Sequence, residues 1–314
     1  MASFEQHPVD PSTIVIAGPT ASGKSEVALL LAERLGGEIV AVDSMQVYRG
    51  MDIGTAKPSK EDQRRVPHHL INVVDVTRKS DAAQFARMAR QCLEQIQSRG
   101  KVAILCGGTG LYLRAIFNGV GEAPPADAEL RKQLEQTPLP ELLRELAEWD
   151  PVTYEKIDRK NPRRVVRAIK VMRQTGIPFS RQKSNWLSGR ISKGAPAFRA
   201  FGLLRETKDL HERINGRVES MFEQGLVEET RRLLDRGLAE NPTAMQSLGY
   251  RQVVEHLRGE RSLNETIELV KLRTRQFAKR QMTWFRHQLP LRWIDVVADE
   301  RAVAVMQQII AAIA

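Results

Sequence analysis

Residues 18–25 read Gly18-Pro19-Thr20-Ala21-Ser22-Gly23-Lys24-Ser25 and fill every position of the phosphate-loop pattern G-x-x-x-x-G-K-[ST]. An apolar run at 13–17 precedes them and a helix-patterned run at 26–35 follows, which is the strand–loop–helix context that the motif needs. Glycines let the loop amides point at phosphate oxygens, and the helix N-terminus adds partial positive charge. Lys24 would reach the terminal phosphates, and the Ser25 hydroxyl would bind Mg²⁺ as cofactor. The sequence therefore predicts a polyphosphate or pyrophosphate site and leaves open which compound binds.

The chain around this loop alternates apolar runs with helical patterns. Further strands are predicted at 38–43, 70–74, 102–106 and, after a helical region, 197–204; a helix is predicted at 82–99. Such alternation is typical of an α/β fold of the P-loop NTPase kind, a mostly parallel sheet flanked by helices. Ligands bind at the carboxyl ends of parallel strands, so we expect Asp43-Ser44 and the turn at 107–110 to join the phosphate loop there.

The pattern changes near residues 121–125, which read Gly-Glu-Ala-Pro-Pro. From about 126 to 190 the sequence is helical without a convincing strand and is interrupted by prolines, whereas 208–287 is helical again. We therefore expect a P-loop-type core with C-terminal helices at 1–122 and 195–314, and a smaller all-helical insertion domain at 123–194.

Composition points to a cytoplasmic protein. No apolar run approaches the length of a membrane span, and the first ten residues lack the basic start and apolar core of a signal peptide. Cys92 and Cys106 lack metal-ligand spacing and resemble small core residues in a reducing compartment. The formal net charge of +10 favours a partner with many phosphates, such as a nucleic acid.

Two segments concentrate the positive charge. Residues 159–173 hold seven basic side chains and no acid, and Arg163, Arg167 and Lys170 fall on one helix face. Residues 271–286 hold six basic side chains and no acid, with Trp284 and Phe285 beside them as possible stacking platforms for bases. Either segment alone could be a solvated helix face, and Trp284 alone could be a core residue. Together they favour nucleic-acid binding.

Several motifs resemble those of the tRNA dimethylallyltransferase family. The loop at 18–25 has that family's Gly-Pro-Thr beginning, and DSMQVYRGMDIGTAKP at 43–58 is similar to its most distinctive block. Further matches are PHHL at 67–70, GGTGLY at 107–112, GYRQ at 249–252 and KRQMTWFR at 279–286, so the resemblance spans nearly the whole chain. The chain as given lacks the zinc finger of eukaryotic members, from which we expect a bacterial-type enzyme.

The resemblance implies a reaction and a set of site residues. The family transfers a dimethylallyl group from dimethylallyl diphosphate to N6 of adenine 37, beside the tRNA anticodon, and releases diphosphate. By resemblance, residues 18–25 hold the diphosphate, Asp43 is the candidate base, Thr109 lies near the bridging oxygen and Arg217 adds a cation. Without the resemblance, Asp43 and Thr109 read equally well as turn residues.

The family also implies contacts with tRNA, by a chain that we expect to be a monomer. The insertion domain is expected to take part in them. The residues expected to contact tRNA are Asp43, Ser44, Met45, Gln46, Arg163, Arg164, Val165, Val166, Arg167, Gln246, Gly249, Tyr250, Arg251, Lys279, Arg280, Trp284 and Arg286.

Two other functions fit part of the pattern. A kinase of the nucleoside-monophosphate type would share the loop, the sheet and a helical lid, but would not need acid-free basic helices. A nucleotide-switched RNA-binding protein would explain the charge and the loop without any transfer reaction. The 43–58 block argues against both alternatives.

Overall fold

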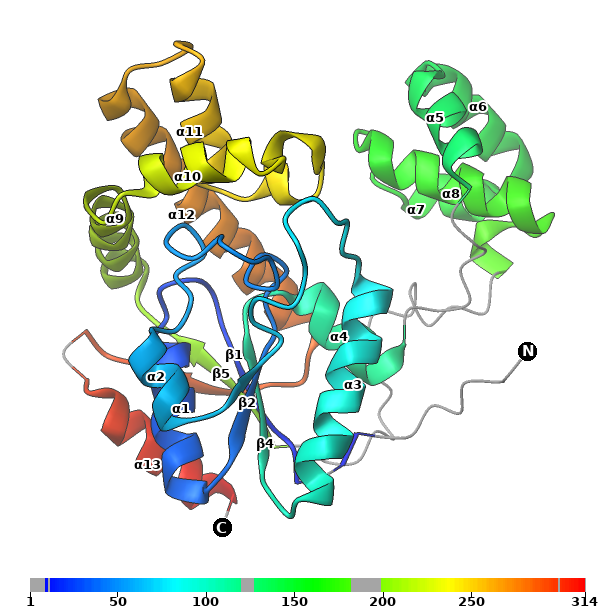
Figure 1. Ribbon diagram of the computed structural model, residues 1–314. Helices are drawn as coiled ribbons and strands as arrows, with labels where there is room; N and C mark the ends of the chain where they lie inside the picture. Colours follow the sequence, from blue (N-terminus) through cyan, green and yellow to red (C-terminus); the bar gives the residue numbers. More distant parts are fainter. Residues whose placement is uncertain (1–8, 11, 120–126, 182–198, 299, 314) are drawn as a thin grey trace. The chain divides into compact units, whose positions relative to one another are not determined.

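The computed structural model describes residues 9–10, 12–119, 127–181, 199–298 and 300–313 (Figure 1). The chain divides into two compact units, one formed by Met1–Gly119 with Arg190–Ala314 and the other by Val120–Gly189. The sequence predicted an insertion at 123–194, and both of those boundaries lie outside the described residues. The two units are therefore described separately.

The larger unit is built on a parallel sheet. Its strands are β1 (Ile14–Ala17), β2 (Glu38–Ala41), β3 (His68–His69), β4 (Ala103–Gly107), β5 (Arg199–Leu204) and β6 (Arg292–Asp295). They lie in the order β3-β2-β4-β1-β5-β6, and each neighbouring pair is parallel. This arrangement confirms the predicted α/β fold with a mostly parallel sheet.

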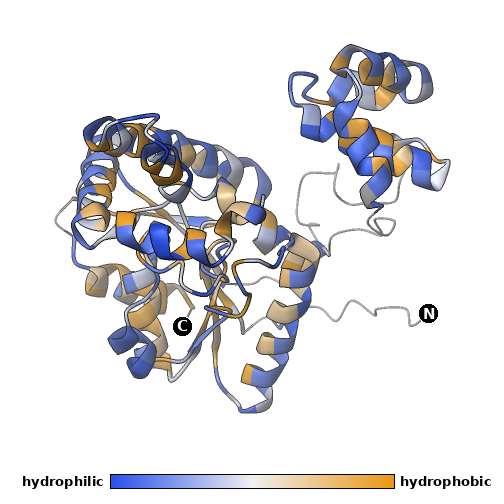
Figure 2. Cartoon of the chain, turned by 45° about the horizontal axis from the view of Figure 1, so that its top comes forward, coloured by the Kyte–Doolittle hydropathy of each residue, from blue (hydrophilic) through white to orange (hydrophobic). Residues whose placement is uncertain are grey.

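Helices cover both faces of the sheet, which explains why β1, β2 and β4 are buried along their whole length. Figure 1 shows α1 (Lys24–Leu35) and α13 (Ala302–Ile313) on one face, and α3 (Ala82–Ser98) and α4 (Gly110–Asn118) on the other. Between the first pair and the sheet, Ile16, Leu31 and Ile309 have no exposed surface. In Figure 2 the strands are correspondingly hydrophobic and the surrounding helices mixed.

Four more helices lie beyond the carboxyl ends of the strands (Figure 1). They are α9 (Thr207–Glu223), α10 (Leu226–Asp235), α11 (Tyr250–Leu257) and the long α12 (Leu263–Gln288), with short 3₁₀ turns at Leu238–Glu240 and Ala244–Gln246. The connection after β2 contains α2 (Lys60–Arg65). These helices confirm the predicted helical character of 208–287 and cover the edge of the sheet where ligands bind in such folds.

The smaller unit is helical throughout its described residues. It contains α5 (Ala128–Gln136), α6 (Leu139–Trp149), α7 (Pro151–Lys156), α8 (Pro162–Thr175) and a 3₁₀ turn at Phe179–Arg181. Its core is apolar and includes Leu142, Leu146 and Ile169. The unit thus has a hydrophobic core of its own.

Two elements differ from the sequence prediction. The strand predicted at 70–74 is wrong: Leu70 and Asn72 adopt left-handed φ angles of 63° and 58°, which end the extended chain, and the strand that pairs with β2 is His68–His69. The sequence analysis also missed β6 and α13, which complete the sheet edge and one helical layer. In the parts of the chain that the structure describes, no helix is both long and apolar enough to span a bilayer.

Candidate active site

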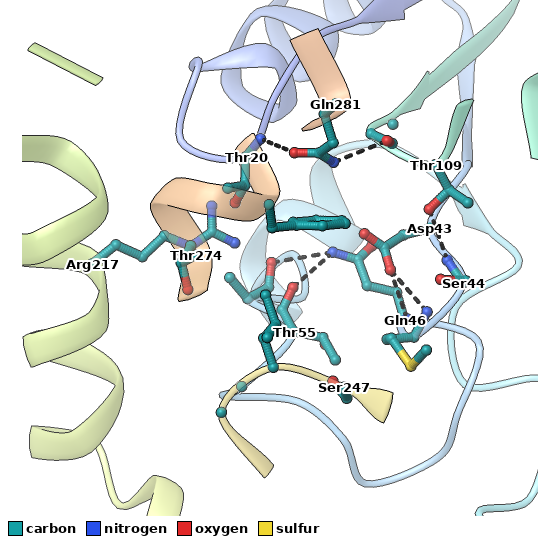
Figure 3. Close-up of a pocket in the computed structure, with 18 of the residues that line it drawn as sticks. Thr20, Asp43, Ser44, Gln46, Thr55, Thr109, Arg217, Ser247, Thr274 and Gln281 are labelled. Carbon is teal, nitrogen blue, oxygen red and sulfur yellow. Dashed lines mark hydrogen bonds between the residues drawn. The ribbon is translucent and has the colours of Figure 1, made fainter. Parts of the chain in front are cut away.

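A cavity of about 380 Å³ lies at the carboxyl edge of the sheet in the larger unit (Figure 3). Three segments at the ends of strands line it: the phosphate loop after β1, residues 43–46 after β2 and residues 107–109 at the end of β4. Helices α9 and α12 supply the opposite wall. The fold therefore brings together three segments that the sequence analysis expected to meet.

The phosphate loop places a half-buried cation at the start of α1. Gly23 takes a left-handed φ of 94°, and Lys24 is the first residue of the helix. The Lys24 ammonium donates to the Pro19 carbonyl oxygen at 3.1 Å. Burial lowers the pKa of Lys24, and the nearby Arg217 lowers it further, whereas Asp43 and Cys106 oppose the shift. A cation that is costly to bury and has a helix N-terminus beside it suits an anionic ligand.

Asp43 uses one carboxylate oxygen for a turn. Its Oδ1 accepts hydrogen bonds from the backbone N–H groups of Met45 at 2.8 Å and Gln46 at 3.3 Å. Among the described residues no donor reaches Oδ2, and the carboxylate lines the cavity (Figure 3). The turn interpretation and the base interpretation are thus compatible, because they use different oxygens.

Thr109 and Arg217 approach the same space. The Thr109 hydroxyl oxygen accepts from the Ser44 N–H at 3.2 Å, so its own proton can be donated to a ligand. Figure 3 shows Arg217 extending from α9 into the cavity toward Thr20. Burial lowers the pKa of Arg217, and the Asp43 charge opposes that shift.

Gln281 on α12 connects two of the three loops. Its Oε1 accepts from the Thr20 N–H at 2.9 Å, and its Nε2 donates to the Gly108 carbonyl oxygen at 2.9 Å (Figure 3). The side chain is buried, so neither bond is replaced by water at low cost. Gln281 therefore fixes the spacing between the phosphate loop and the turn that carries Thr109.

Comparison with known proteins agrees with this geometry. The model of the IPP transferase family matches residues 46–288. The chain belongs to the IPP transferase family. It is 43% identical to the tRNA dimethylallyltransferase of Desulforudis audaxviator, covering 97% of this chain and 98% of that protein. It is 46% identical to the tRNA dimethylallyltransferase of Geobacter metallireducens, covering 90% and 92%.

Solved structures of the family share the fold. The tRNA isopentenylpyrophosphate transferase of Bacillus halodurans is 35% identical, with a TM-score of 0.70 over 97% of this chain and 96% of that one. A eukaryotic dimethylallyltransferase solved acting on tRNA is 27% identical, with a TM-score of 0.77 over 96% and 79%. The resemblance inferred from the motifs is confirmed.

Three residues that were expected to contact tRNA are core residues in this IPP transferase family member. Val165 and Val166 belong to the apolar core of the smaller unit. Tyr250 has no exposed surface, and its hydroxyl donates to Glu229. Their side chains cannot reach RNA, which corrects the sequence prediction for these three positions.

The other expected RNA residues fall into groups. Ser44, Met45, Gln46, Gln246, Gly249 and Arg280 line the cavity with Asp43. Lys279 and Arg286 line a neighbouring groove along α12. Exposed Arg251 forms an ion pair with Glu255 at 3.1 Å. Trp284 is half-buried against Gly110, where an added Cβ would lie 2.1 Å from the indole. Arg163, Arg164 and Arg167 are exposed on α8 of the smaller unit.

Sequence reasoning named Arg217 on α9 and Arg280 on α12, but it missed the uncharged side chains that these two helices turn into the cavity. Val270, Thr274, Phe277 and Gln281 follow one another at helical spacing, and Ile214 and Val218 do the same on α9. This helical spacing is the pattern from which these cavity residues could have been predicted. The sequence analysis instead used the basic residues of 271–286.

A metal ion at this site would depend on few protein ligands. Among the described residues no group of three or more His, Cys, Asp or Glu side chains could hold one. Ser25 is exposed in the first turn of α1 and lines the cavity. This donor set fits Mg²⁺, which keeps several waters and is usually held by one or two side chains together with substrate phosphates.

The affinity for pyrophosphate should depend on pH through the protonation of Lys24. Because burial lowers its pKa, the ammonium loses its proton at lower pH than an ordinary lysine, so affinity should fall as pH rises through that pKa. Lys24→Arg keeps its charge at all these pH values. We expect calorimetric titrations with pyrophosphate from about pH 7 to about pH 10 to show a steeper loss for the wild type than for Lys24→Arg. Equal losses would assign the effect to another group.

Replacing Gln281 should destabilise the larger unit. Gln281→Leu leaves the Thr20 N–H and the Gly108 carbonyl oxygen without their partner, at a cost of about 1–3 kcal/mol for buried groups. Gln276→Leu, on an exposed position of the same helix, is the matched control and should change stability by less than about 0.5 kcal/mol. Urea unfolding followed by circular dichroism measures both. Indistinguishable variants would mean that the bridge is dispensable.

Proposed function

We propose that this chain transfers a dimethylallyl group from dimethylallyl diphosphate to N6 of adenine 37 in the anticodon loop of tRNA, releasing diphosphate. The observation that carries the proposal is a single cavity that joins a phosphate loop to the Asp43–Gln46 turn and an apolar wall. The names of the most similar relatives, tRNA dimethylallyltransferases, support the same reaction. The chain would meet tRNA in the cytoplasm and act as a monomer.

The leaving group defines the main electrostatic task. N6 attacks C1 of the prenyl group while the C1–O bond breaks, and the electron pair of that bond leaves with the diphosphate. Lys24, Arg217 and the amides at the start of α1 would stabilise the growing negative charge. Thr109 would donate its hydroxyl proton toward the bridging oxygen. Removing one such preorganised donor typically costs ~10²–10³ in rate.

The acceptor needs help because the lone pair of N6 is delocalised into the adenine ring. Asp43 Oδ2, which no donor among the described residues occupies, would accept the proton that N6 loses, while Oδ1 continues to hold the turn. The turn fixes the carboxylate before the base arrives. This preorganisation supports Asp43 as base, or at least as the group that orients N6.

The apolar wall favours a prenyl diphosphate over a nucleotide. Ile214, Val218, Val270 and Phe277 line the cavity opposite the strand-end loops. A five-carbon chain would be favourably buried against them, whereas ribose hydroxyls would lose their hydrogen bonds to water. Mg²⁺, if bound at Ser25, would neutralise part of the diphosphate charge.

The RNA must present its base in this cavity. A stacked adenine cannot reach it, so adenine 37 would be flipped out of the anticodon loop, and Asp43 to Gln46 would meet it. Arg163, Arg164 and Arg167 on α8, Gln246, Gly249 and Arg251, and the α12 side chains Lys279, Arg280 and Arg286 would contact the surrounding RNA. Half-buried Trp284 would support α12 rather than stack on a base.

The reaction can be tested directly by mass spectrometry. Unmodified tRNA incubated with the protein, Mg²⁺ and dimethylallyl diphosphate should gain one dimethylallyl group on a single adenosine beside the anticodon. Dimethylallyl diphosphate should also raise the melting temperature more than ATP does. No gain with several tRNAs, together with phosphoryl transfer from ATP to a small acceptor, would contradict the proposal.

The variant Asp43→Asn distinguishes the role of Asp43 as proton acceptor from its role in holding the turn. Asparagine Oδ1 can still accept from Met45 and Gln46, so the loop should keep its conformation while the proton acceptor is lost. We expect kcat to fall by ~10²–10⁴ and the affinity for pyrophosphate to stay within about twofold. Single-turnover prenylation and calorimetry measure the two quantities. Weaker pyrophosphate binding with the rate preserved would exclude Asp43 as the base.

The arginines of α8 should appear in the salt dependence of tRNA binding. Replacing Arg163 and Arg167 by alanine should raise the KM for tRNA and reduce the slope of log affinity against log salt by about 1.4–1.8, if each arginine contacts one phosphate. Arg173→Ala is the matched control, since Arg173 lies on the same helix, forms an ion pair with Glu145 at 2.7 Å and is not among the residues proposed to contact RNA. An unchanged slope in the double variant would remove this helix from the RNA surface.

A further inference from the structure

Glu229 is a buried carboxylate that the reaction described above does not use. It lies on α10 with 5% of its surface exposed. It accepts hydrogen bonds from the backbone N–H groups of Asp52 at 3.2 Å, Ile53 at 3.0 Å and Gly54 at 3.4 Å. The Tyr250 hydroxyl donates to it at 2.5 Å. In the described parts of the chain no cation lies within 4 Å of it, so its direct partners are backbone and hydroxyl dipoles, and the charge of Lys57 acts on it from farther away.

These contacts fix the backbone of the loop at 52–56. The Tyr250 hydroxyl also accepts from the Gly54 N–H at 3.1 Å, and its ring lies so close that a Cβ at Gly54 would be 2.5 Å from it. Thr55 donates its hydroxyl to the Met51 carbonyl oxygen at 2.6 Å. The loop therefore has little freedom to move away from α10 and α11.

The same loop determines how Gln46 faces the cavity. Gln46 Nε2 donates to the carbonyl oxygens of Thr55 at 3.1 Å and Ala56 at 3.3 Å (Figure 3). Because both partners are acceptors, the amide nitrogen has to face them. Among the described residues no donor reaches Oε1, and Gln46 lines the cavity beside Asp43. Gln46 is thereby left to offer an acceptor to a ligand.

We propose that Glu229 and Tyr250 are positioning residues that help the cavity to select adenine as the target base of the RNA. They hold the Thr55 and Ala56 carbonyls, which hold the Gln46 amide, so that Oε1 is presented to the flipped base. An acceptor complements the exocyclic amine of adenine and opposes the carbonyl at the same position of inosine or guanine. This inference rests on the proposed function, because it requires RNA to enter the cavity.

The decisive measurement is a ratio of affinities. Anticodon stem-loops with adenosine or inosine at the target position are titrated against each protein variant. The wild type should bind the adenosine RNA more tightly by about tenfold or more, because the inosine carbonyl oxygen would face the Gln46 Oε1 acceptor with no proton between them. In Glu229→Gln the new amide group opposes the backbone N–H donors and displaces the loop, so the ratio should fall below about threefold.

Two further variants separate positioning from simple loss of folding. Tyr250→Phe keeps the ring against Gly54 but removes the hydroxyl. It should therefore also lower the preference for adenosine RNA over inosine RNA, and it tests the proposal even if Glu229→Gln does not fold. Glu228→Gln, at the exposed neighbouring position of α10, should keep the wild-type ratio. Pyrophosphate affinity should stay within about twofold in every folded variant, because the phosphate loop makes none of these contacts.

The outcomes test the positioning role of Glu229 and Tyr250 separately from the proposed transfer reaction. If Glu229→Gln and Tyr250→Phe keep the wild-type ratio, or if the wild type has no preference for adenosine, the positioning role is wrong. If both variants bind adenosine RNA and inosine RNA more weakly by the same factor, the ratio is again unchanged, and Glu229 only stabilises the fold. The proposed function is tested separately by prenylation of tRNA with the wild-type protein, and it stands or falls with that product.

Discussion

The position of the Lys24 ammonium is the constraint around which the site is organised. A half-buried ammonium with one carbonyl acceptor at 3.1 Å is costly unless an anion completes its surroundings. The fold places it at the start of α1, where unpaired amides and the helix dipole add to the positive potential. Arg217 from α9 raises that potential again. A diphosphate would offset the cost of all these groups at once, which explains why they are gathered in one cavity.

The side of the cavity that contains Asp43 is held differently, because its conformation depends on local hydrogen bonds and the ion pair between Lys57 and Asp52. Asp43 closes its own turn, and Lys57 donates to the Tyr48 carbonyl, to Asp52 at 2.7 Å and to Asn72 at 2.6 Å. These bonds are local to the 43–72 segment, with Glu229 as a distant anchor. A loop held in this way can keep an exposed carboxylate oxygen ready for a substrate without collapsing onto it.

Local chemistry explains what the sequence could predict. The phosphate loop, β1 and α1 were predictable because the motif and its apolar flanks are contiguous. The prediction of a strand at 70–74 was wrong because Leu70 and Asn72 take left-handed φ angles. Neither residue type requires such an angle, so nothing in the sequence indicated it. Val165 and Val166 lie within a contiguous basic run, but they are buried in α8.

The remaining site residues could not be found from local sequence, because their partners are far away along the chain. The bond from Thr20 to Gln281 spans 261 residues, and the bond from Asp52 to Glu229 spans 177. A glutamine among cations or a glutamate on an amphipathic helix looks like a surface residue until tertiary packing buries it. The apolar side of α12 carried a periodic signal, but the charge of the other side was more conspicuous.

The two halves of the cavity are held by different parts of the larger unit. The sheet and α1 fix the half that is proposed to hold diphosphate, whereas α10 and α11 fix the half that is proposed to hold the base, through Glu229 and Tyr250. Helix α12 is shared, since Gln281 bonds the phosphate loop and the turn of Thr109, while Phe277 and Arg280 line the same cavity. Because distant contacts with separate partners change independently, substitutions in α10 and α11 would, on the proposed roles, alter base recognition without affecting diphosphate binding. Substitutions on the inner face of α12 would affect the binding of both proposed substrates.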